Sequence, residues 1–312
     1  MPEPSLATLL RRRYDGSRRP PGAEGGRRAM GEWPNGCRVA VCLTWDVDGE
    51  AAQYVRFPDR ARGQLAELHQ RLYGPQVGIW KVLTLLERYG VPGTFYVPAY
   101  TARRHPEVIA AIRDAGHPVG LHGYLHESLD TLDRTTEAAI LRRSQRELGA
   151  LLGYAPTLYR APSWELNRWT PELLVQHGVE SDSSLMDAES PYWLAAGDAE
   201  LLEIPIHWLL DDAEHWNHSR ANRDKAIADP DAVFRLWAGE FEGYHQSGGC
   251  YVLTLHPFIS GRWTYMQVVE RLIRHIRGFP GVWWTTLAEV TLWAKRQADL
   301  PHRTSPPAAP AD

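Results

Sequence analysis

The sequence predicts an α/β fold with a parallel sheet, either open or closed into a barrel. Short apolar runs that suit buried strands alternate along the chain with amphipathic segments of helical length. Strand-then-helix units repeated in this way are typical of parallel sheets, because a helix returns the chain across the sheet before the next strand begins. The 312 residues contain no internal repeat and suffice for one large barrel-type domain or two smaller ones.

Each expected element has a local reason in the sequence. The expected strands are apolar runs next to turn or polar residues, at 39–45, 94–97, 158–160, 201–206, 250–255 and 282–284. The expected helices carry apolar residues at helical spacing, at 78–89, 105–115, 135–152, 171–177, 231–244, 268–276 and 287–297. Four of these helices are followed by a glycine that can form a left-handed C-cap, namely Gly90, Gly116, Gly153 and Gly178.

The two ends of the chain differ in composition from its middle. Residues 1–36 mix Gly, Pro and Arg, and residues 298–312 contain Pro-Pro and Ala-Ala-Pro, so we expect unstructured tails around one folded domain at 37–297. The short N-terminal apolar patch precedes its arginines, the reverse of a secretory signal, and no apolar run reaches the ~18–20 residues of a membrane span. These features predict a cytoplasmic protein with no membrane partner. We expect a homo-oligomer, in which the basic N-terminal tail could serve as an arm.

Charge and cysteine content exclude two further classes. The net charge is -4 and no long block of like charge occurs in the middle of the chain, so nucleic acid is not an expected partner. The three cysteines, Cys37, Cys42 and Cys250, are too scattered for a disulfide framework or a thiolate zinc site. We expect them to be small buried side chains in a reducing compartment.

Three separated segments carry candidate metal ligands. Asp46 and Asp48 follow the first strand, where binding sites form in α/β folds. His122 and His126 have the spacing that places both rings on one face of a helical turn, and His256 follows another expected strand. Taken singly, the acids could be a turn element and the histidines a solvated helix face. Together, one carboxylate and two imidazoles leave coordination positions open, which is typical of a catalytic ion and predicts a metal-dependent hydrolase.

The chain resembles the polysaccharide deacetylase family, also called the NodB-homology group or carbohydrate esterase family four. The resemblance rests on these segments in this order and on the sequence Arg160-Ala161-Pro162-Ser163-Trp164 between the second and the last. The nearest branch contains cytoplasmic allantoinase-like and cyclic-imide hydrolases and peptidoglycan deacetylase-like proteins. The resemblance covers about residues 37 to 295. It implies a distorted (β/α)7 barrel of the NodB-homology type, with the catalytic domain at 37–297.

The resemblance also implies a role for each matching residue. Asp46 corresponds to the general base, and Arg160 to the arginine that holds this aspartate ionised. Asp48, His122 and His126 correspond to the ligands of a divalent metal ion, for which Zn²⁺ is the default in hydrolytic His/Asp sites. His256 corresponds to the general acid that protonates the leaving nitrogen.

Three residues are candidates for substrate binding. A backbone N–H near Ser163 could complete an oxyanion site. Trp164 and Trp208 lie beside candidate loops at strand ends, where an aromatic face could stack on a sugar ring or on a planar imide ring. For Trp208, packing in the core is an equally good interpretation.

Departures from the sugar-deacetylase pattern favour a small amide or cyclic imide or ureide as the substrate. Leu185 and Met186 stand where the family usually has the aspartate that tunes the acid histidine and a pocket tryptophan. Position 163 is serine where secreted deacetylases carry an aromatic residue. Without that aspartate, burial should lower the pKa of His256, unless Asp187 or a residue of the 208–212 loop replaces it.

Two other functions stay open. One is the N-deacetylation of peptidoglycan fragments or amino sugars. The other is a metal-binding protein without turnover, which the presence of both Asp46 and His256 disfavours. An iron oxygenase site is disfavoured because its carboxylate usually stands two residues after the first histidine, where this chain has Tyr124.

Overall fold

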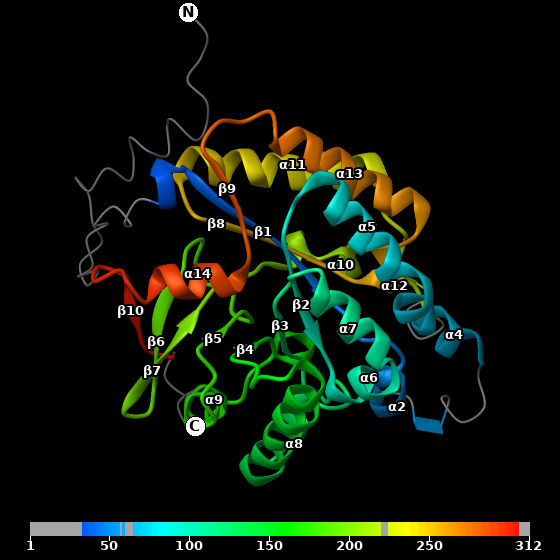
Figure 1. Cartoon of the computed structure of the whole chain (residues 1–312), viewed down its shortest axis with the longest axis vertical. Coiled ribbons are helices and arrows are strands. Elements are labelled where there is room, and N and C mark those ends of the chain that lie inside the picture. The colour runs from blue at the N-terminus through cyan, green and yellow to red at the C-terminus, as the bar shows by residue number, and fades with distance from the viewer. Residues whose placement is uncertain (1–32, 57, 60–64, 220–223, 306–312) are drawn as a thin grey trace, which may run out of the picture.

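A computed structural model describes residues 33–56, 58–59, 65–219 and 224–305. These residues form a mostly parallel sheet with helices around it (Figure 1), so the predicted α/β fold of the NodB-homology type is confirmed. The strand order is β10-β6-β7-β5-β4-β3-β2-β1-β8, and β9 also pairs with β1. Within the described part of the chain no ladder joins β8 to β10, so the strands curve into a distorted barrel that does not close.

The strands are short, and most of their residues are buried. Their bounds are Val39–Asp46 (β1), Gly93–Val97 (β2), Val119–Leu121 (β3), Leu158–Tyr159 (β4), Ser181–Asp182 (β5), Tyr192–Ala196 (β6), Ala199–Glu203 (β7), Cys250–Leu255 (β8), Val282–Thr285 (β9) and His302–Arg303 (β10). The pair β6–β7 is antiparallel, and the other pairs among these strands are parallel.

Strand β1 is the centre of the molecule. All eight of its residues are buried, as expected for a strand covered on both faces. One of its edges pairs with β8. The other edge is shared, because β9 pairs with residues 39–42 and β2 with residues 43–46. The C-terminal end of β1 therefore lies between the ends of β2 and β8, and that end carries Asp46.

Helices lie around the sheet, with α5, α11 and α13 grouped on one side in Figure 1 and α6, α7 and α8 on another. Their bounds are Ala51–Arg56 (α2), Leu65–Tyr73 (α4), Ile79–Tyr89 (α5), Ala99–Arg104 (α6), Pro106–Asp114 (α7), Arg134–Leu152 (α8), Thr170–Gln176 (α9), Asp212–Trp216 (α10), Pro230–Ser247 (α11), Pro257–Ser260 (α12), Trp263–Ile276 (α13) and Leu287–Ala294 (α14). Among the described helices, none has the length and apolar character that crossing a membrane requires.

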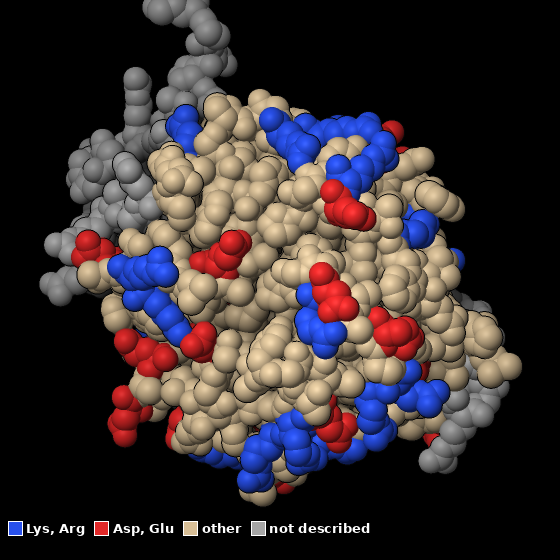
Figure 2. All heavy atoms as spheres, viewed as in Figure 1, with Lys and Arg blue, Asp and Glu red and all other residues tan. Residues whose placement is uncertain are grey.

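Charges on the surface are mixed. On the face shown in Figure 2, basic side chains gather over the region of α5 and α13 and again near α8, and acidic side chains lie among them. Arg88 and Arg274, for example, both pair with Glu270. This face therefore has no field of a single sign.

The expected long elements agree with the structure to within a few residues, and the differences lie in the short ones. The expected strand at 201–206 is one arm of the hairpin β6–β7, whose two-residue turn begins at Gly197 with φ 67°. A strand of two residues such as β5 shows no alternation, and helices α2 and α6, of six residues each, are too short for a clear period.

The ends of the folded region also differ from the expected bounds. Residues 1–32 of the expected N-terminal tail lie outside the described residues. Trp33 is buried, and its ring centroid lies 4.2 Å from that of Trp293. At the other end, the expected tail begins at 298, but β10 joins the sheet and Trp193 donates a backbone hydrogen bond to Pro301.

Candidate metal centre and active site

The polar residues singled out from the sequence meet at the C-terminal edge of the sheet. Asp46 is the last residue of β1, His122 follows β3, Arg160 follows β4 and His256 follows β8. Parallel strands end at the same edge, which explains why residues so far apart in the chain meet. They surround a cavity of about 260 Å³, whose lining residues are Asp46, Asp48, Arg71, His122, His126, Ser163, Trp164, Trp208, Asp211, Ala213, Glu214, Asn217, Lys225 and His256.

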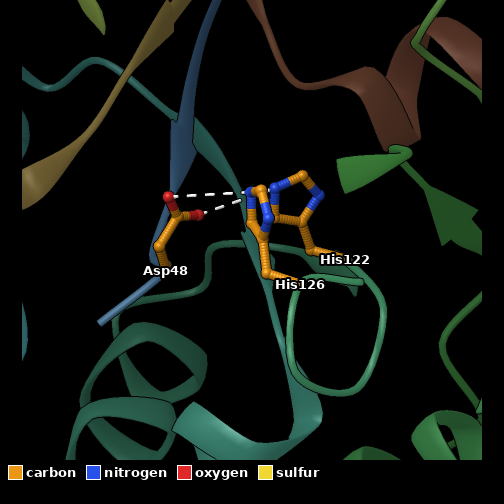
Figure 3. A group of neighbouring side chains, drawn as sticks. All are labelled: Asp48, His122 and His126. Carbon is orange, nitrogen blue, oxygen red and sulfur yellow. Dashed lines mark ion pairs between the residues drawn. The ribbon is translucent and has the colours of Figure 1, made fainter. Parts of the chain in front are cut away.

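Asp48, His122 and His126 form a compact buried cluster (Figure 3). Each offers one ligand atom, and these atoms lie within 4.8 Å of one another. The Nε2 atom of His122 is 3.6 Å from Oδ1 of Asp48, and the Nε2 atom of His126 is 3.8 Å from Oδ2. Among the described residues, Oδ1 of Asp48 is buried and accepts no hydrogen bond. A buried carboxylate oxygen that faces imidazole nitrogens in this way fits a divalent cation.

A loop brings the two histidines together, which differs from the helical turn expected from their spacing. Gly123 has φ 71° and His126 has φ 62°. Glu127 holds this loop, because its carboxylate accepts the backbone N–H groups of Tyr124 and Leu125, both at 2.9 Å. A side chain at position 123 would meet Glu127 at 2.9 Å, so glycine is needed there. The sequence interpretation missed the role of Glu127.

The backbone orients His122. Its Nδ1 lies 2.8 Å from the carbonyl oxygen of Arg160, which can only accept, so this nitrogen carries the proton. Nε2 then faces Asp48 and is the ring nitrogen that can bind a metal ion. The charges around Asp48 act in the same direction. Burial alone would raise the pKa of Asp48, but His126, His256, His122 and Arg71 together hold it far below its usual range.

Asp46 and Arg160 form a buried ion pair. The Nη1 atom of Arg160 donates to Oδ1 of Asp46 at 2.9 Å and to Thr44 at 2.8 Å, and the guanidinium also donates to the backbone and hydroxyl oxygens of Ser183. Its plane lies over Tyr96. The other oxygen of Asp46, Oδ2, is 3.8 Å from Nε2 of His122. Asp46 therefore has one oxygen bound to an arginine and the other directed toward the ligand cluster.

Asp212 takes the place of the aspartate that is absent at Leu185. Its Oδ1 lies 2.6 Å from Nδ1 of His256, and its Oδ2 accepts the backbone N–H of His256 at 2.9 Å and the hydroxyl of Ser260. Burial disfavours the charged ring, but Asp212, with Asp211 and Asp48, raises the pKa of His256 to about 10. Of the two alternatives left by the sequence, the 208–212 loop is therefore correct, and the lowered pKa expected without such a partner does not occur.

Asp211, Asp212 and His256 are also near enough to one another to hold a cation. Hydrogen bonds already occupy this group, since both oxygens of Asp212 and Nδ1 of His256 are bonded. Burial raises the pKa of Asp211, the positive charge of His256 lowers it, and the negative charge of Asp212 raises it again. The result is a pKa of about 8. A carboxyl that keeps its proton is a poor ligand, so we treat this group as the support of His256.

Two tryptophans form one wall of the cavity. The rings of Trp164 and Trp208 are stacked, with centroids 4.5 Å apart and an angle of 21° between planes. Trp164 is buried, and Trp208 is 41% exposed, so Trp208 lies at the surface and not in the core. Ser163 and Trp164 both have positive φ, 58° and 59°, a strained conformation for residues other than glycine. Such strain often occurs at binding sites, and it directs Trp164 toward Trp208 here.

The sequence interpretation also missed Arg71. This residue belongs to α4, is buried, and lines the cavity. Its Nη1 atom is 3.6 Å from Oδ2 of Asp48, and its guanidinium lies 4.0 Å above the ring of Phe258. Nothing in the pattern of residues 65–73 distinguishes this arginine from a surface one.

The chain has an α/β fold with an open, distorted barrel and, at the C-terminal edge of the sheet, an Asp-His-His cluster that could hold a divalent metal ion. Comparison with known proteins agrees. Residues 73–181 match the family model described as polysaccharide deacetylase. The chain is 30% identical over 251 residues to a peptidoglycan deacetylase from Helicobacter pylori, covering 72% of this chain and 86% of that protein. The chain belongs to the polysaccharide deacetylase family, as the sequence predicted.

Solved structures support the same assignment. A Mycobacterium smegmatis crystal structure assigned to the polysaccharide deacetylases is 38% identical, with a TM-score of 0.86, and the match covers 90% of this chain and 98% of that one. The PuuE allantoinase is 20% identical, with a TM-score of 0.75 and coverage of 88% and 96%, and it shows the shared fold alone. Membership of this family confirms the predicted class, an enzyme that hydrolyses carbon–nitrogen bonds other than peptide bonds.

Proposed function

We propose that the protein hydrolyses the carbon–nitrogen bond of a small amide or of a cyclic imide or ureide, with a divalent metal ion, Zn²⁺ by default, held by Asp48, His122 and His126. One observation carries this proposal. A carboxylate and an imidazole lie on the same cavity as these three residues, and each has its own buried partner of opposite charge: Arg160 for Asp46 and Asp212 for His256.

The metal ion, when bound, would lower the pKa of a water molecule and polarise the carbonyl group. Asp46 takes the proton of the attacking water at Oδ2, since Oδ1 stays bonded to Arg160. His256 gives a proton from Nε2 to the leaving nitrogen, because its Nδ1 is bonded to Asp212. In the balanced reaction, the carbon–nitrogen bond breaks and a carbon–oxygen bond forms. Asp46 receives one proton and His256 supplies another.

The electrostatics of the two proton carriers suit these roles. Arg160 is bonded to Oδ1 of Asp46, so Oδ2 is the oxygen that faces the ligand cluster and can accept a proton. His256, with a pKa near 10, carries its proton at neutral pH, as an acid must. Amide cleavage requires such an acid, since an amine anion is a very poor leaving group. A metal-binding protein without turnover would need neither pair, so this alternative is disfavoured.

A second candidate is the N-deacetylation of peptidoglycan fragments or amino sugars. It is favoured by the similarity to the Helicobacter pylori peptidoglycan deacetylase. The tryptophan wall could pack against a sugar ring as well as against an imide ring. A cavity of about 260 Å³ lies below the usual range of ligand sites, ~300–1,000 Å³, which suits one ring better than a polymer chain.

The test is a substrate panel on the metal-loaded protein, with allantoin, hydantoins, succinimide and acetylated amino sugars. We expect turnover of at least one compound and its loss in Asp48→Ala, His122→Ala and His126→Ala together with their metal. His117→Ala is the control, since His117 packs against Phe95 outside the cavity. Full metal content in all three variants would refute the ligand assignment. Turnover of the amino sugars alone would select the second candidate.

Three finer points belong to the same proposal, and each has a direct assay. Zn²⁺ as the native ion is tested by elemental analysis of the protein as purified. A homo-oligomer is tested by sedimentation, and a cytoplasmic location by cell fractionation.

A further inference from the structure

Arg71 is a charged residue of the cavity to which the proposed mechanism gives no role. It lies on α4, its side chain is 8% exposed, and its Nη1 atom is 3.6 Å from Oδ2 of Asp48. Phe258 packs under the guanidinium at 4.0 Å, and Phe258 comes two residues after His256. Arg71 thus contacts a candidate metal ligand and a residue close in sequence to the candidate acid, and it lines the cavity that both border.

Two other cations of the cavity also have acidic partners. Lys225 pairs with Glu214 at 3.2 Å and donates to the carbonyl oxygen of Ala213 at 3.1 Å. His256 is bonded to Asp212. The carboxylate beside Arg71 is Asp48, and this carboxylate is the one proposed to bind the metal ion. Loading with a divalent ion therefore places two additional positive charges close to a buried guanidinium, an arrangement that an anionic ligand would stabilise.

Resting on the proposed function, we propose that Arg71 determines specificity by binding a carboxylate of the substrate, so that the preferred substrates are acylated amines or cyclic ureides with a carboxylate near the reacting carbon–nitrogen bond. A guanidinium presents its donors as a planar fork that matches a carboxylate, and stacking on Phe258 fixes the plane of that fork. The stacked pair Trp164 and Trp208 lines the same cavity and is available for the ring of the substrate.

A different role is possible for the same geometry, and it makes different predictions. If Arg71 only supported Asp48, its replacement would weaken metal binding and lower activity on all substrates alike. If it binds the substrate, metal binding stays unchanged and the loss is confined to acidic substrates.

The experiment compares two substrate pairs that differ by a carboxylate: N-acetylglucosamine with N-acetylmuramic acid, and hydantoin with hydantoin-5-acetic acid. The variants are Arg71→Gln, which removes the charge, and Arg71→Lys, which keeps it without the fork. Arg262→Gln is the matched control. The guanidinium of Arg262 also stacks on an aromatic ring, that of Tyr73 on α4, at 3.5 Å, but Arg262 does not line the cavity. Thermal unfolding checks that each variant is folded.

We expect Arg71→Gln to raise KM for the acidic member of a pair roughly 10- to 100-fold, the range of one lost charge-assisted interaction, with kcat and the neutral member little changed. Arg71→Lys should recover part of this loss, and Arg262→Gln should behave as the wild type. Three results would overturn the inference. Arg71→Gln could lose activity equally on both members of a pair, or it could bind zinc more weakly than the wild type. The wild type itself could show no preference for the acidic member.

A binding measurement separates this inference from the proposed function. Succinate carries carboxylates and no carbon–nitrogen bond, so its calorimetric affinity for the zinc-loaded protein needs no turnover. If the wild type hydrolyses none of the four compounds, the proposed function fails for them, and succinate still tests Arg71. Succinate affinity should fall roughly 10- to 100-fold in Arg71→Gln. Equal affinity in wild type and variant would refute the role of Arg71.

Discussion

Replacement of Asp212 by asparagine should separate the charge on His256 from the position of its ring. Asp212 lies 2.6 Å from Nδ1 of His256 and is its nearest carboxylate. The pKa of about 10 for His256, against an ordinary 6.5, corresponds to a preference of roughly 5 kcal/mol for the charged ring. A single neighbouring charge accounts for about 1–3 pKa units. Asparagine has nearly the shape of aspartate and lacks this charge.

The sign of the effect follows from the role of His256 as an acid. Activity requires the protonated ring, so the rate falls as the pH rises through its pKa. In Asp212→Asn the pKa falls, and the alkaline limb of kcat/KM should move down by about 1–3 pH units. Near pH 9 this means a loss of about twofold for a shift of one unit and about a hundredfold for a shift of three, and near pH 6 the variant should remain close to the wild type.

The assay is the pH profile of kcat/KM, together with an NMR titration of His256 in both proteins. Asp211→Asn is the control. Its carboxyl lies 3.6 Å from the same nitrogen, against 2.6 Å for Asp212, and it is a smaller cause of the raised pKa of His256. This control should move the limb in the same direction but by less than Asp212→Asn. An unchanged limb in Asp212→Asn, with His256 still titrating as in the wild type, would show that Asp212 does not tune the acid.

Four other changes have expected outcomes. Asp46→Asn should keep the metal and lower kcat by a factor on the order of 10²–10⁴, and loss of the ion would mean that Asp46 and Asp48 have exchanged roles. Chelation should abolish activity, and Zn²⁺ should restore it in the wild type but not in His126→Ala, as followed by elemental analysis and rate. His256→Ala should lower kcat/KM more on amides with basic leaving amines than on imides, whose nitrogen is less basic, and equal losses would make His256 structural. Burial, and then the nearby Asp182, raises the pKa of Glu203, so its ionisation costs stability as the pH rises above the ordinary range of glutamate. Glu203→Gln should therefore raise the melting temperature above that of the wild type near pH 8 but not near pH 4, and a lower value near pH 8 would contradict this.

The sequence predicts the parts of the site that depend on strand ends. Asp46 and His256 directly follow apolar runs, so their place at one edge of a parallel sheet could be inferred without coordinates. The pair His122 and His126 was recognised by its spacing, but the spacing pointed to a helix. The loop that brings the two rings together depends on Gly123 and on Glu127, whose bonds to the backbone become visible only once the loop is built.

The parts that could not be predicted depend on contacts between distant segments. Asp212 was one of several alternatives because its distance to His256 is set by the packing of the 208–212 loop beside β8, where Asp211 bridges to Thr254. Arg71 could not be found, since its helix reaches the site from the side and not from a strand end. The sequence predicts only one strand, 201–206, where the structure has the hairpin β6–β7, because an antiparallel pair breaks the regular alternation of strand and helix.

The pairing of β10 with β6 has a consequence for any shortened or tagged form of the protein. His302 pairs with Glu200, and Arg303 with Asp187. Ending the chain at 297, the bound inferred from composition, would uncover the outer backbone groups of β6 and leave them as a template for a strand of another molecule. A purification handle fused directly after the helix α14 would therefore favour self-association, whereas one placed beyond residue 305 would leave this edge protected.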